Sequence, residues 1–398
     1  MSVKPKIKIA VFTGNRAEYG LQFPILRALT ADDRFDVYLL VGGAHLQENF
    51  GNTKAEIEKD GFKIYREVDI KMDHDTLYAT AQVIGTGVLS VSKILDELKP
   101  DWFVIYADRF ESFAAMIAGT QMGLPTIHIE GGDYTEGGAL DDTVRHAMTK
   151  LAHLHFTTNE QAAERVRRMG EEPWRVFNIG QPSLDLAAAG EYAPASDLIS
   201  SLGLDAAKPL ILFCQHSITT EYERAVEQIR PSIVTLKRIL EEGCQVIMTY
   251  PNNDAGGMRI VDEIRSAFPG QLAGLQIHKS LGRYRFHGVL NFIGRVGRGA
   301  FVGNSSALIK ETPYFGCPAV NIGPRQRGRL RGNNVIDVSY NEQEIYNAIR
   351  RCLEDKNFQQ QCAHCDNPYG AGNAGPRIAE VLATMPRDNR LIQKKMAY

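Results

Sequence analysis

The chain has 398 residues, of which 44% are hydrophobic and 23% are charged. This composition is typical of a soluble globular protein, and the length predicts two domains because one hydrophobic core seldom grows so large. Lys and Arg total 45 against 47 for Asp and Glu, so the net charge of −2 offers no general field for nucleic acid or an anionic membrane.

The first residues, Met1–Phe12, contain only a short apolar run that breaks at Thr13-Gly14. They predict a first strand and not a signal peptide, and no later stretch approaches the ~18 to 20 apolar residues of a membrane span. We therefore expect a cytoplasmic protein with reduced thiols. Cys362-Ala-His-Cys365 has the spacing of half a zinc site or a redox pair, but no second pair accompanies it, so no metal is predicted.

Strands alternate with helix-length segments along the first half, which predicts a parallel sheet. The predicted elements are strand 6–12, helix 21–30, strand 35–41, helix 53–60, helix 80–98, strand 102–106, helix 112–122, strand 125–129, helix 141–152, strand 155–158, helix 160–169 and strand 175–179. Together they predict a doubly wound domain over residues 1–185.

Small residues and Pro between Gly180 and about Lys208 predict a linker. A second Rossmann-like domain is predicted over 205–370, from strand 209–214, helix 225–242, strand 245–249, helix 258–267, strands 275–278 and 301–302, helix 306–312, strand 319–322 and a helix to about 354. Residues 371–398, helical from about 375 to 385, are expected to return to the first domain. The predicted fold is α/β, with two doubly wound domains facing a cleft.

Three groups of acids stand out: Asp108, Glu130 and the pair Asp141-Asp142. The first two follow buried strands, and ligands of open α/β sheets bind at such carboxyl ends. Neighbouring buried carboxylates can take base and acid roles in removing and returning a proton at carbon. The alternative is structural, in which the acids cap helices or pair with Arg109 and Arg145.

Groups suited to phosphate lie mainly in the second half. Gly303-Asn-Ser-Ser306 follows a strand and opens a helix, where backbone N–H groups would face a diphosphate. Gly323–Arg331 carries four arginines, which suit phosphate oxygens but also a solvated loop. Arg16 lies at the first strand-to-helix turn, which lacks the spacing of a dinucleotide-binding glycine motif, so no nicotinamide cofactor is expected.

Several motifs occur in a familiar order: Thr13-Gly-Asn-Arg-Ala-Glu-Tyr-Gly-Leu21, Ala107-Asp-Arg-Phe-Glu-Ser112, His128-Ile-Glu-Gly-Gly132, Thr135–Asp142 with Arg145-His146, Pro251-Asn-Asn-Asp254, Gly303–Ser306 and Asn321-Ile-Gly323 with Arg325–Gly328. From about residue 8 to 380 the chain closely resembles the hydrolysing UDP-N-acetylglucosamine 2-epimerases of bacterial sialic acid and legionaminic acid biosynthesis. The resemblance implies the domain arrangement of GT-B glycosyltransferases, with the nucleotide mainly on the C-terminal domain.

The resemblance also implies the chemistry. A base removes the proton at C2 of the sugar while UDP leaves C1, and water adds to the enzyme-bound 2-acetamidoglucal to give free UDP and N-acetylmannosamine. The substrate is a UDP-activated 2-acetamido sugar, either UDP-N-acetylglucosamine or UDP-N,N'-diacetylbacillosamine. No cofactor or metal is implied, and a homodimer is expected.

Asp108, Glu130 and Asp142 match the family's catalytic carboxylates, although the adjacent Asp141 leaves the third assignment open. His216 matches a histidine that meets the diphosphate, and its positive form would help UDP to leave. The further UDP-sugar contacts that the resemblance implies are Arg16 and Arg325 at phosphates, Ser305 and Ser306 at the diphosphate, Glu311 at the ribose, Phe286 or Tyr284 at the uracil, and Asp141, Arg145, Asn253 and Asn304.

Some residues depart from the family pattern. Ala107 replaces a glycine, Ala307-Leu308 replace Ser-Gly, and Ala371 replaces a common aspartate. Residues 42–51 lack the Gln-His-Arg type of sequence of the non-hydrolysing epimerases, which favours hydrolysis. Two other classes compete with this interpretation: a GT-B glycosyltransferase, which needs an acceptor groove but no three acids around C2, and a non-catalytic nucleotide-sugar sensor.

Overall fold

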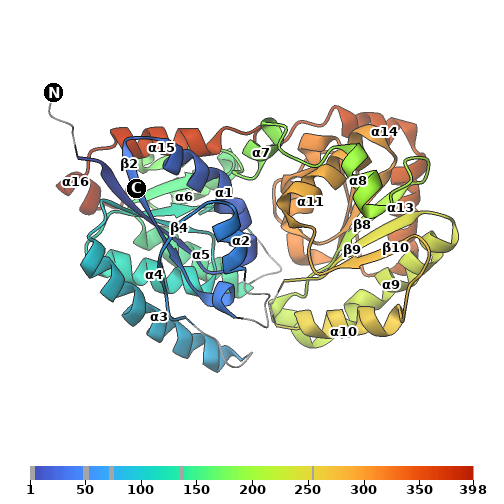
Figure 1. Cartoon of the computed structure of the whole chain (residues 1–398), viewed down its shortest axis with the longest axis horizontal. Coiled ribbons are helices and arrows are strands. Elements are labelled where there is room, and N and C mark those ends of the chain that lie inside the picture. Colours follow the sequence, from blue (N-terminus) through green and yellow to red (C-terminus); the bar gives the residue numbers. More distant parts are fainter. Residues whose placement is uncertain (1–4, 48–52, 71–75, 135–138, 253–254, 398) are drawn as a thin grey trace. The chain divides into compact units, whose positions relative to one another are not determined.

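The computed structural model describes residues 5–47, 53–70, 76–134, 139–252 and 255–397, with the backbone alone for residue 77 and residues 139–141. The chain divides into two compact units (Figure 1). The first comprises Met1–Tyr134, Leu140–Asp185 and Gly372–Tyr398, and the second contains Leu186–Ala371. Each unit has its own parallel sheet and its own hydrophobic core.

The first unit contains a seven-stranded sheet in the order β3-β2-β1-β4-β5-β6-β7. Its strands are β1 (Ile7–Thr13), β2 (Phe35–Val41), β3 (Ile64–Glu67), β4 (Trp102–Tyr106), β5 (Thr126–Ile129), β6 (Leu154–Thr157) and β7 (Val176–Asn178). The central strands β4, β5 and β6 are buried along their whole length, as expected where helices cover both faces. The strand order reverses between β1 and β4, and this switch point is where such sheets bind ligands.

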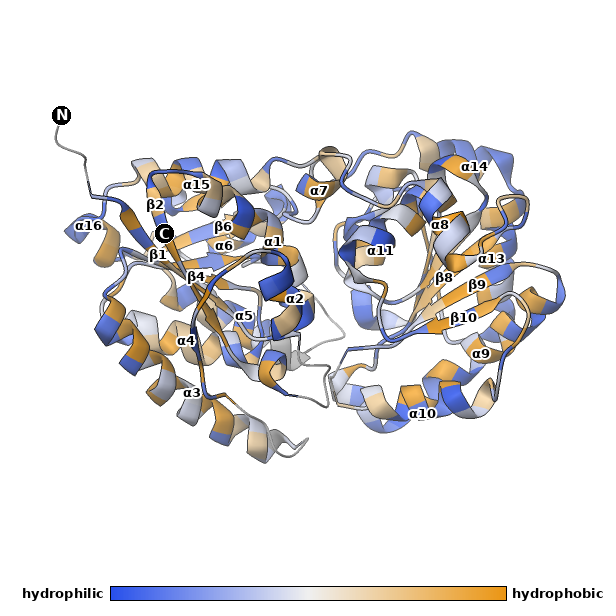
Figure 2. Ribbon diagram, viewed as in Figure 1, coloured by the Kyte–Doolittle hydropathy of each residue, from blue (hydrophilic) through white to orange (hydrophobic). Residues whose placement is uncertain are grey.

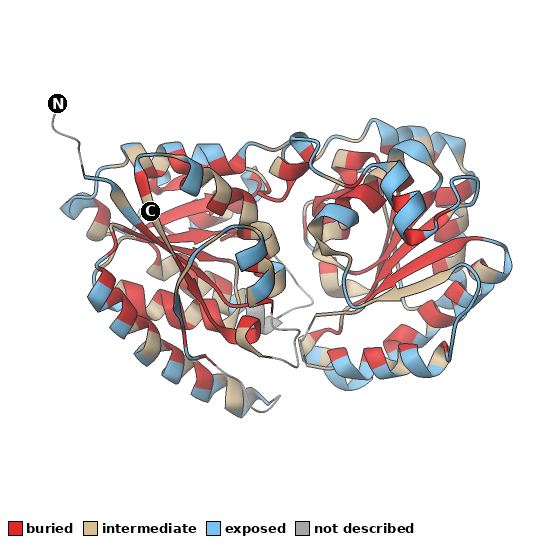
Figure 3. Ribbon diagram, in the orientation of Figure 1, coloured by how far each residue is buried: buried red, intermediate tan, exposed pale blue. Residues whose placement is uncertain are grey.

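Helices cover both faces of this sheet, and their outer sides are exposed while the strands are buried (Figure 3). They are α1 (Arg16–Ala31), α2 (Lys54–Lys59), α3 (Leu77–Leu98), α4 (Phe110–Gln121), α5 (Ala139–Leu151), α6 (Glu160–Arg168), α15 (Ala374–Thr384) and α16 (Asn389–Ile392). The Asn15 side chain caps α1 by accepting from the backbone N–H of Glu18 at 3.0 Å.

The C-terminal segment packs on the first unit, where α15 lies alongside α1 (Figure 1). The Asp185 carboxylate accepts the backbone N–H groups of Ala374 and Gly375, both at 2.7 Å, at the start of α15. Farther on, the buried indole of Trp102 donates to Leu382 O at 3.1 Å. Hydrogen bonds as well as apolar packing therefore hold the segment on the first unit.

The second unit contains a six-stranded parallel sheet in the order β10-β9-β8-β11-β12-β13. Its strands are β8 (Leu210–Cys214), β9 (Gln245–Thr249), β10 (Leu275–His278), β11 (Gly299–Gly303), β12 (Ala319–Ile322) and β13 (Val335–Val338). Figure 2 shows the hydrophobic colouring of the central strands. The order reverses between β8 and β11, so the carboxyl ends of these two strands form the switch point of this unit.

The helices of the second unit are α8 (Ala195–Leu202), α9 (Ala225–Glu241), α10 (Gly257–Ala267), α11 (Gly282–Asn291), α12 (Ser306–Lys310), α13 (Glu342–Glu354) and α14 (Lys356–Ala363), and α7 (Leu184–Ala188) enters it from the first unit. A π-helical turn, Phe292–Val296, follows α11 directly. Among the described helices, none combines the length and apolarity required to cross a membrane.

The α/β prediction with two parallel sheets is confirmed, but some elements differ from those predicted. The elements predicted from the sequence did not include β3, β13 or α11, nor α7 and α8, which lie within the predicted linker. The predicted helix 306–312 ends at Lys310, where Thr312 precedes Pro313 and a tighter turn takes over.

Candidate active site

Sharp turns directly follow β4 and β5. Ala107 and Glu130 have φ values of 58° and 68°, in the left-handed region that glycine favours. The ring of His128 fixes the first turn, because its Nε2 lies 2.6 Å from Ala107 O and donates to it. Burial lowers the pKa of His128 to about 3, so this ring is neutral. The family that this chain resembles has glycine at position 107. In Ala107 the left-handed conformation costs about 1–2 kcal/mol, and the hydrogen bond from His128 helps to stabilise it.

Arg145 on α5 forms ion pairs with two of the predicted acids. Its guanidinium pairs with Asp108 after β4 and with Asp142 one helical turn away, and it donates to Asp133 O at 3.2 Å. The Arg145 side chain is only 3% exposed, against 19% for Asp108 and 14% for Asp142. The pairing that the structural alternative predicted is therefore present, and it holds two carboxylates together at the carboxyl edge of the sheet.

The charge around Arg145 is predominantly negative. Burial lowers the pKa of Arg145, but the charges of Asp108, Asp133, Asp142 and Glu130 outweigh this effect and raise it overall. Glu130 is 8% exposed and follows β5, the strand next to β4. The structure thus places Asp108, Glu130 and Asp142 around one buried cation. The side chain of Asp141 lies outside the described residues, so the choice between Asp141 and Asp142 stays open.

Arg16 begins α1 at the carboxyl end of β1, on the other side of the same switch point. Its side chain is 41% exposed and forms an ion pair with Glu56 at 3.0 Å. An exposed ion pair of this kind contributes little to stability, so the guanidinium is available to exchange this partner for an anion.

A pair of buried acids, Glu18 and Glu111, lies beneath this turn. Glu18 accepts from Gly14 N at 3.3 Å, from the Gln22 amide at 2.7 Å and from the Ser112 hydroxyl at 3.0 Å. Burial, and next the charge of Glu111, raise the pKa of Glu18 to about 8. Glu18 is therefore protonated at neutral pH.

The pKa of Glu18 is about 8 in the folded protein, against 4.5 ordinarily. Between these two pH values the folded state keeps a proton on Glu18 that the unfolded state releases. Stability contributed by this group is therefore present at low pH and lost as the pH rises from about 5 to 8. We expect Glu18→Gln to remove this loss, so that its free energy of unfolding rises relative to wild type across the window. Urea unfolding of both proteins at matched pH values measures this difference, and a difference independent of pH would contradict the assignment.

In the second unit, His216 after β8 and Asn304 after β11 hold each other. The backbone N–H of His216 donates to Asn304 Oδ1 at 2.7 Å, and Asn304 Nδ2 donates to His216 O at 2.9 Å. His216 Nδ1 accepts the backbone N–H of Asn252 at 3.1 Å. Since an amide N–H can only donate, the ring proton sits on Nε2, and the ring is neutral in this arrangement. The positive form expected beside a bound diphosphate stays a prediction.

Other predicted phosphate contacts gather around Asn304. Arg325 donates to Asn304 O at 3.0 Å, and the Gln326 amide donates to the same oxygen at 2.7 Å. Ser305 caps α12, because its Oγ accepts from the backbone N–H of Ala307 at 3.4 Å, and its hydroxyl proton is not used in this bond. Ser306 is the first residue of α12. The predicted contact Asn253 lies outside the described residues.

Glu311 lies at the other end of α12, where Oε2 is 2.5 Å from His287 Nε2 on α11. His287 was not among the site residues predicted from the sequence. A signal for it was present in the sequence, because His287 directly follows Phe286, the predicted uracil wall. Phe286 is half-buried and meets Phe301 edge-on with ring centroids 5.7 Å apart, whereas Tyr284 is 50% exposed.

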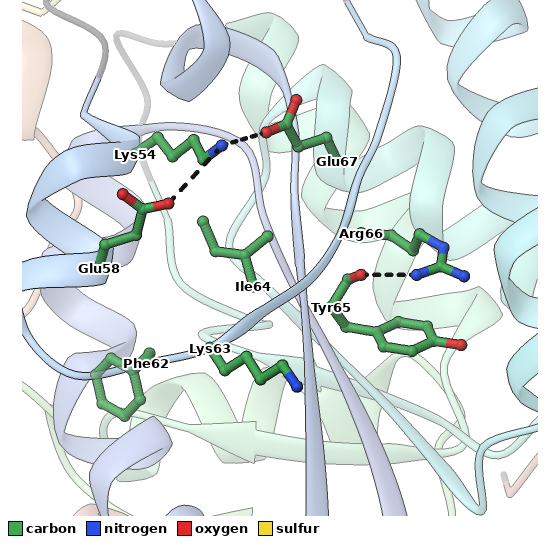
Figure 4. A pocket seen from close by; sticks show the side chains of 8 residues that line it. All are labelled: Lys54, Glu58, Phe62, Lys63, Ile64, Tyr65, Arg66 and Glu67. Carbon is green, nitrogen blue, oxygen red and sulfur yellow. Dashed lines mark hydrogen bonds and ion pairs between the residues drawn. The ribbon is translucent and has the colours of Figure 1, made fainter.

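Two surface cavities have linings that include none of these residues. One of about 530 Å³ follows edge strand β3, where Lys54 is neutralised by Glu67 at 2.6 Å and Glu58 at 3.8 Å (Figure 4). A second, of about 480 Å³, lies at the ends of β12 and β13 and is lined in part by Arg327 and Tyr340. Within the described ranges, no group of three His, Cys, Asp or Glu side chains is placed to hold a metal ion.

Comparisons with known proteins identify the family of this chain. The sequence model of the family described as UDP-N-acetylglucosamine 2-epimerase matches residues 27–383. A "UDP-N,N'-diacetylbacillosamine 2-epimerase (hydrolyzing)" of Legionella pneumophila is 31% identical, over 98% of this chain and 99% of the relative. A "GDP/UDP-N,N'-diacetylbacillosamine 2-epimerase (hydrolyzing)" of Campylobacter jejuni is also 31% identical, over 89% of each chain.

Solved structures extend the comparison to the fold. A UDP-GlcNAc 2-epimerase of Neisseria meningitidis, crystallised bound to UDP-GlcNAc, has a TM-score of 0.79 and 17% identity, and the match covers 94% of this chain and 99% of that chain. The match supports the GT-B-like fold class predicted from the sequence. The extent of the sequence matches shows the family, and this chain belongs to the UDP-N-acetylglucosamine 2-epimerase family.

Proposed function

We propose that this protein is a hydrolysing nucleotide-sugar 2-epimerase, which converts a UDP-activated 2-acetamido sugar and water into UDP and the free manno-configured sugar. The observation that carries the proposal is the set of carboxylates, Asp108, Glu130 and Asp142, around the buried Arg145 at the carboxyl edge of one sheet. The two hydrolysing relatives at 31% identity support it.

The carboxylates suit the step at C2. The proton on this carbon is weakly acidic, so its removal needs a base held close and in line with the C–H bond. Arg145 fixes Asp108 and Asp142 by a two-pronged contact, and Glu130 lies in the same field of charge. One acid removes the proton as UDP leaves C1, and a protonated acid returns a proton to the opposite face as water adds at C1.

The second unit suits the departing diphosphate. Arg325 supplies positive charge beside the end of β11, and the hydroxyls of Ser305 and Ser306 supply further donors. The Nε2–H of neutral His216, which lies 3.4 Å from Cys214 Sγ, would be a further donor on exchanging the thiol for a phosphate oxygen. By resemblance, Glu311 accepts hydrogen bonds from the ribose hydroxyls and Phe286 lies against the uracil.

The homodimer and the cytoplasmic location stay predictions from the sequence.

Two sugars fit the proposal. UDP-N-acetylglucosamine is the substrate that the family description names, and UDP-N,N'-diacetylbacillosamine is the second candidate because the two 31% identical relatives carry that name. The two differ at C4 and C6 of the sugar. A polar group left unpaired in a buried site costs about 1–3 kcal/mol, so one of the two sugars should be preferred clearly.

Proton NMR in heavy water tests the reaction with each sugar in turn. The expected result with one of them is release of UDP together with a free manno sugar deuterated at C2. A UDP-linked manno sugar would indicate the non-hydrolysing reaction. If both sugars stay unchanged in the presence of the protein, the proposal is wrong, and a transferase or a sensor gains support.

We expect Arg325→Ala to weaken UDP binding by about 10-fold or more, because it removes a charged donor worth about 1.5–3 kcal/mol. The loop should keep its place, since Gln326 also donates to Asn304 O at 2.7 Å. Arg327→Ala is the matched control, because Arg327 belongs to the same loop and is exposed. Isothermal titration calorimetry with UDP measures both; equal affinity in wild type and Arg325→Ala would exclude this arginine from the site.

A further inference from the structure

His287 and Glu311 form a buried polar pair within the second unit. His287 is 2% exposed, Glu311 is 6% exposed, and His287 Nε2 lies 2.5 Å from Glu311 Oε2. The imidazole packs against aromatic rings, with its centroid 5.4 Å from that of Phe315 and 6.1 Å from that of Phe286. A short contact in such apolar surroundings fixes the orientation of the carboxylate firmly.

The direction of this hydrogen bond follows from its surroundings. A carboxylate oxygen accepts, so His287 Nε2 carries the proton. His287 Nδ1 is buried and meets no hydrogen-bond partner among the described residues. A second proton there would be buried without an acceptor, so the ring donates from Nε2 alone.

The chemistry of Glu311 defines the kind of ligand that it would accept. A nearly buried carboxylate needs more donors than one imidazole N–H provides, because each oxygen offers two lone pairs. Neutral hydroxyl groups are such donors, whereas a phosphate next to Glu311 would be repelled. Along the axis of α12, at 1.5 Å per residue, Glu311 lies about 9 Å from Ser305, within the length of a nucleoside diphosphate.

We propose that His287 is a positioning residue for the nucleoside: its Nε2–H holds one oxygen of Glu311 and turns the other toward the vicinal hydroxyls of the ribose. This inference rests on the proposed function, since it takes the ligand to be a UDP-sugar. The same residues then discriminate ribose from deoxyribose, because removal of the hydroxyls leaves the second oxygen of Glu311 without the donors that the ribose supplies.

The test compares the affinities of UDP and 2',3'-dideoxy-UDP, measured by calorimetry on the whole protein. Wild type should bind UDP at least 10-fold more tightly than 2',3'-dideoxy-UDP. In His287→Phe, which lacks the donor, we expect the ratio to fall below about 3-fold through loss of UDP affinity, with the affinity for the dideoxy nucleotide unchanged. His287→Gln, whose amide N–H reaches about as far as Nε2, should keep most of the wild-type ratio. Should His287→Phe fail to fold, His287→Met replaces it.

His278→Phe on β10 is the matched control, because His278 is half-buried and contacts Gln276 at 3.2 Å, apart from Glu311. A purely structural role of His287 would weaken both nucleotides equally and leave the ratio unchanged, which would overturn the inference. Wild type that binds UDP without preferring it over the dideoxy form would also overturn it, while the proposed function would stand. Wild type that binds neither nucleotide would remove the proposed function itself.

Discussion

Replacing Asp108 with Asn, or Glu130 with Gln, will lower turnover of the UDP-sugar by about 10²- to 10⁴-fold, the usual contribution of a general acid or base. The dissociation constant for UDP should change by no more than a few fold. The physical reason is that both carboxylates lie around Arg145 in the first unit, whereas Arg325, Ser305 and the other proposed phosphate contacts belong to the second. Single-turnover kinetics and calorimetry with UDP measure the two effects separately.

Both substitutions are designed to keep the local structure. Asn and Gln retain a carbonyl oxygen, so Arg145 can still donate to position 108. Asp185→Asn provides the matched control, because Asp185 is an acid of the same unit that binds two N–H groups at the start of α15. It should lower the unfolding midpoint and leave turnover intact. If Asp108→Asn and Glu130→Gln instead lose folding or UDP binding, the acids are structural.

Much of the fold could be predicted because its central strands are signalled locally. The strands at 102–106, 245–249 and 319–322 were predicted with the bounds that the structure shows, since each is a short apolar run that ends in turn residues. The edge strands β3 and β13 were missed, because Ile64-Tyr-Arg-Glu67 and Val335-Ile-Asp-Val338 are partly exposed and carry charged residues. Their pairing with β2 and β12 supplies what their own sequence does not signal.

In the candidate site, too, some residues could be predicted from the sequence and others could not. Positions at strand ends, such as Asp108 and Asn304, could be predicted because the chain order of strands and glycine-rich turns indicates the carboxyl edge of a sheet. The partners of those residues are set by contacts between distant segments, so Arg145 could be given only as one alternative partner of the acids, and His287 was not predicted. Arg145 meets Asp108 from 37 residues away, and His287 meets Glu311 from 24 residues away. The neutral state of His216 likewise depends on Asn252 N–H, 36 residues later in the chain.

Replacing Arg145 with Met should destabilise the first unit by about 3–5 kcal/mol, the usual cost of leaving buried charges without their partner. Asp108 and Asp142 would then repel each other, with Asp133 and Glu130 adding to the negative charge. Urea unfolding at neutral pH measures the change. Arg145→Lys should restore part of the stability, because an ammonium keeps the charge but not the planar fork that contacts both carboxylates.

A second substitution distinguishes the effect of the Arg145 charge from the effect of its packing. Adding Asp142→Asn to Arg145→Met removes one of the unpaired charges, so the double variant should be more stable than Arg145→Met alone, although Asp142→Asn in wild type removes a favourable contact. This reversal of sign follows only if Arg145 offsets the repulsion between the acids. If Asp142→Asn has the same effect in both backgrounds, Arg145 acts through packing, and the closeness of the two carboxylates must have another cause.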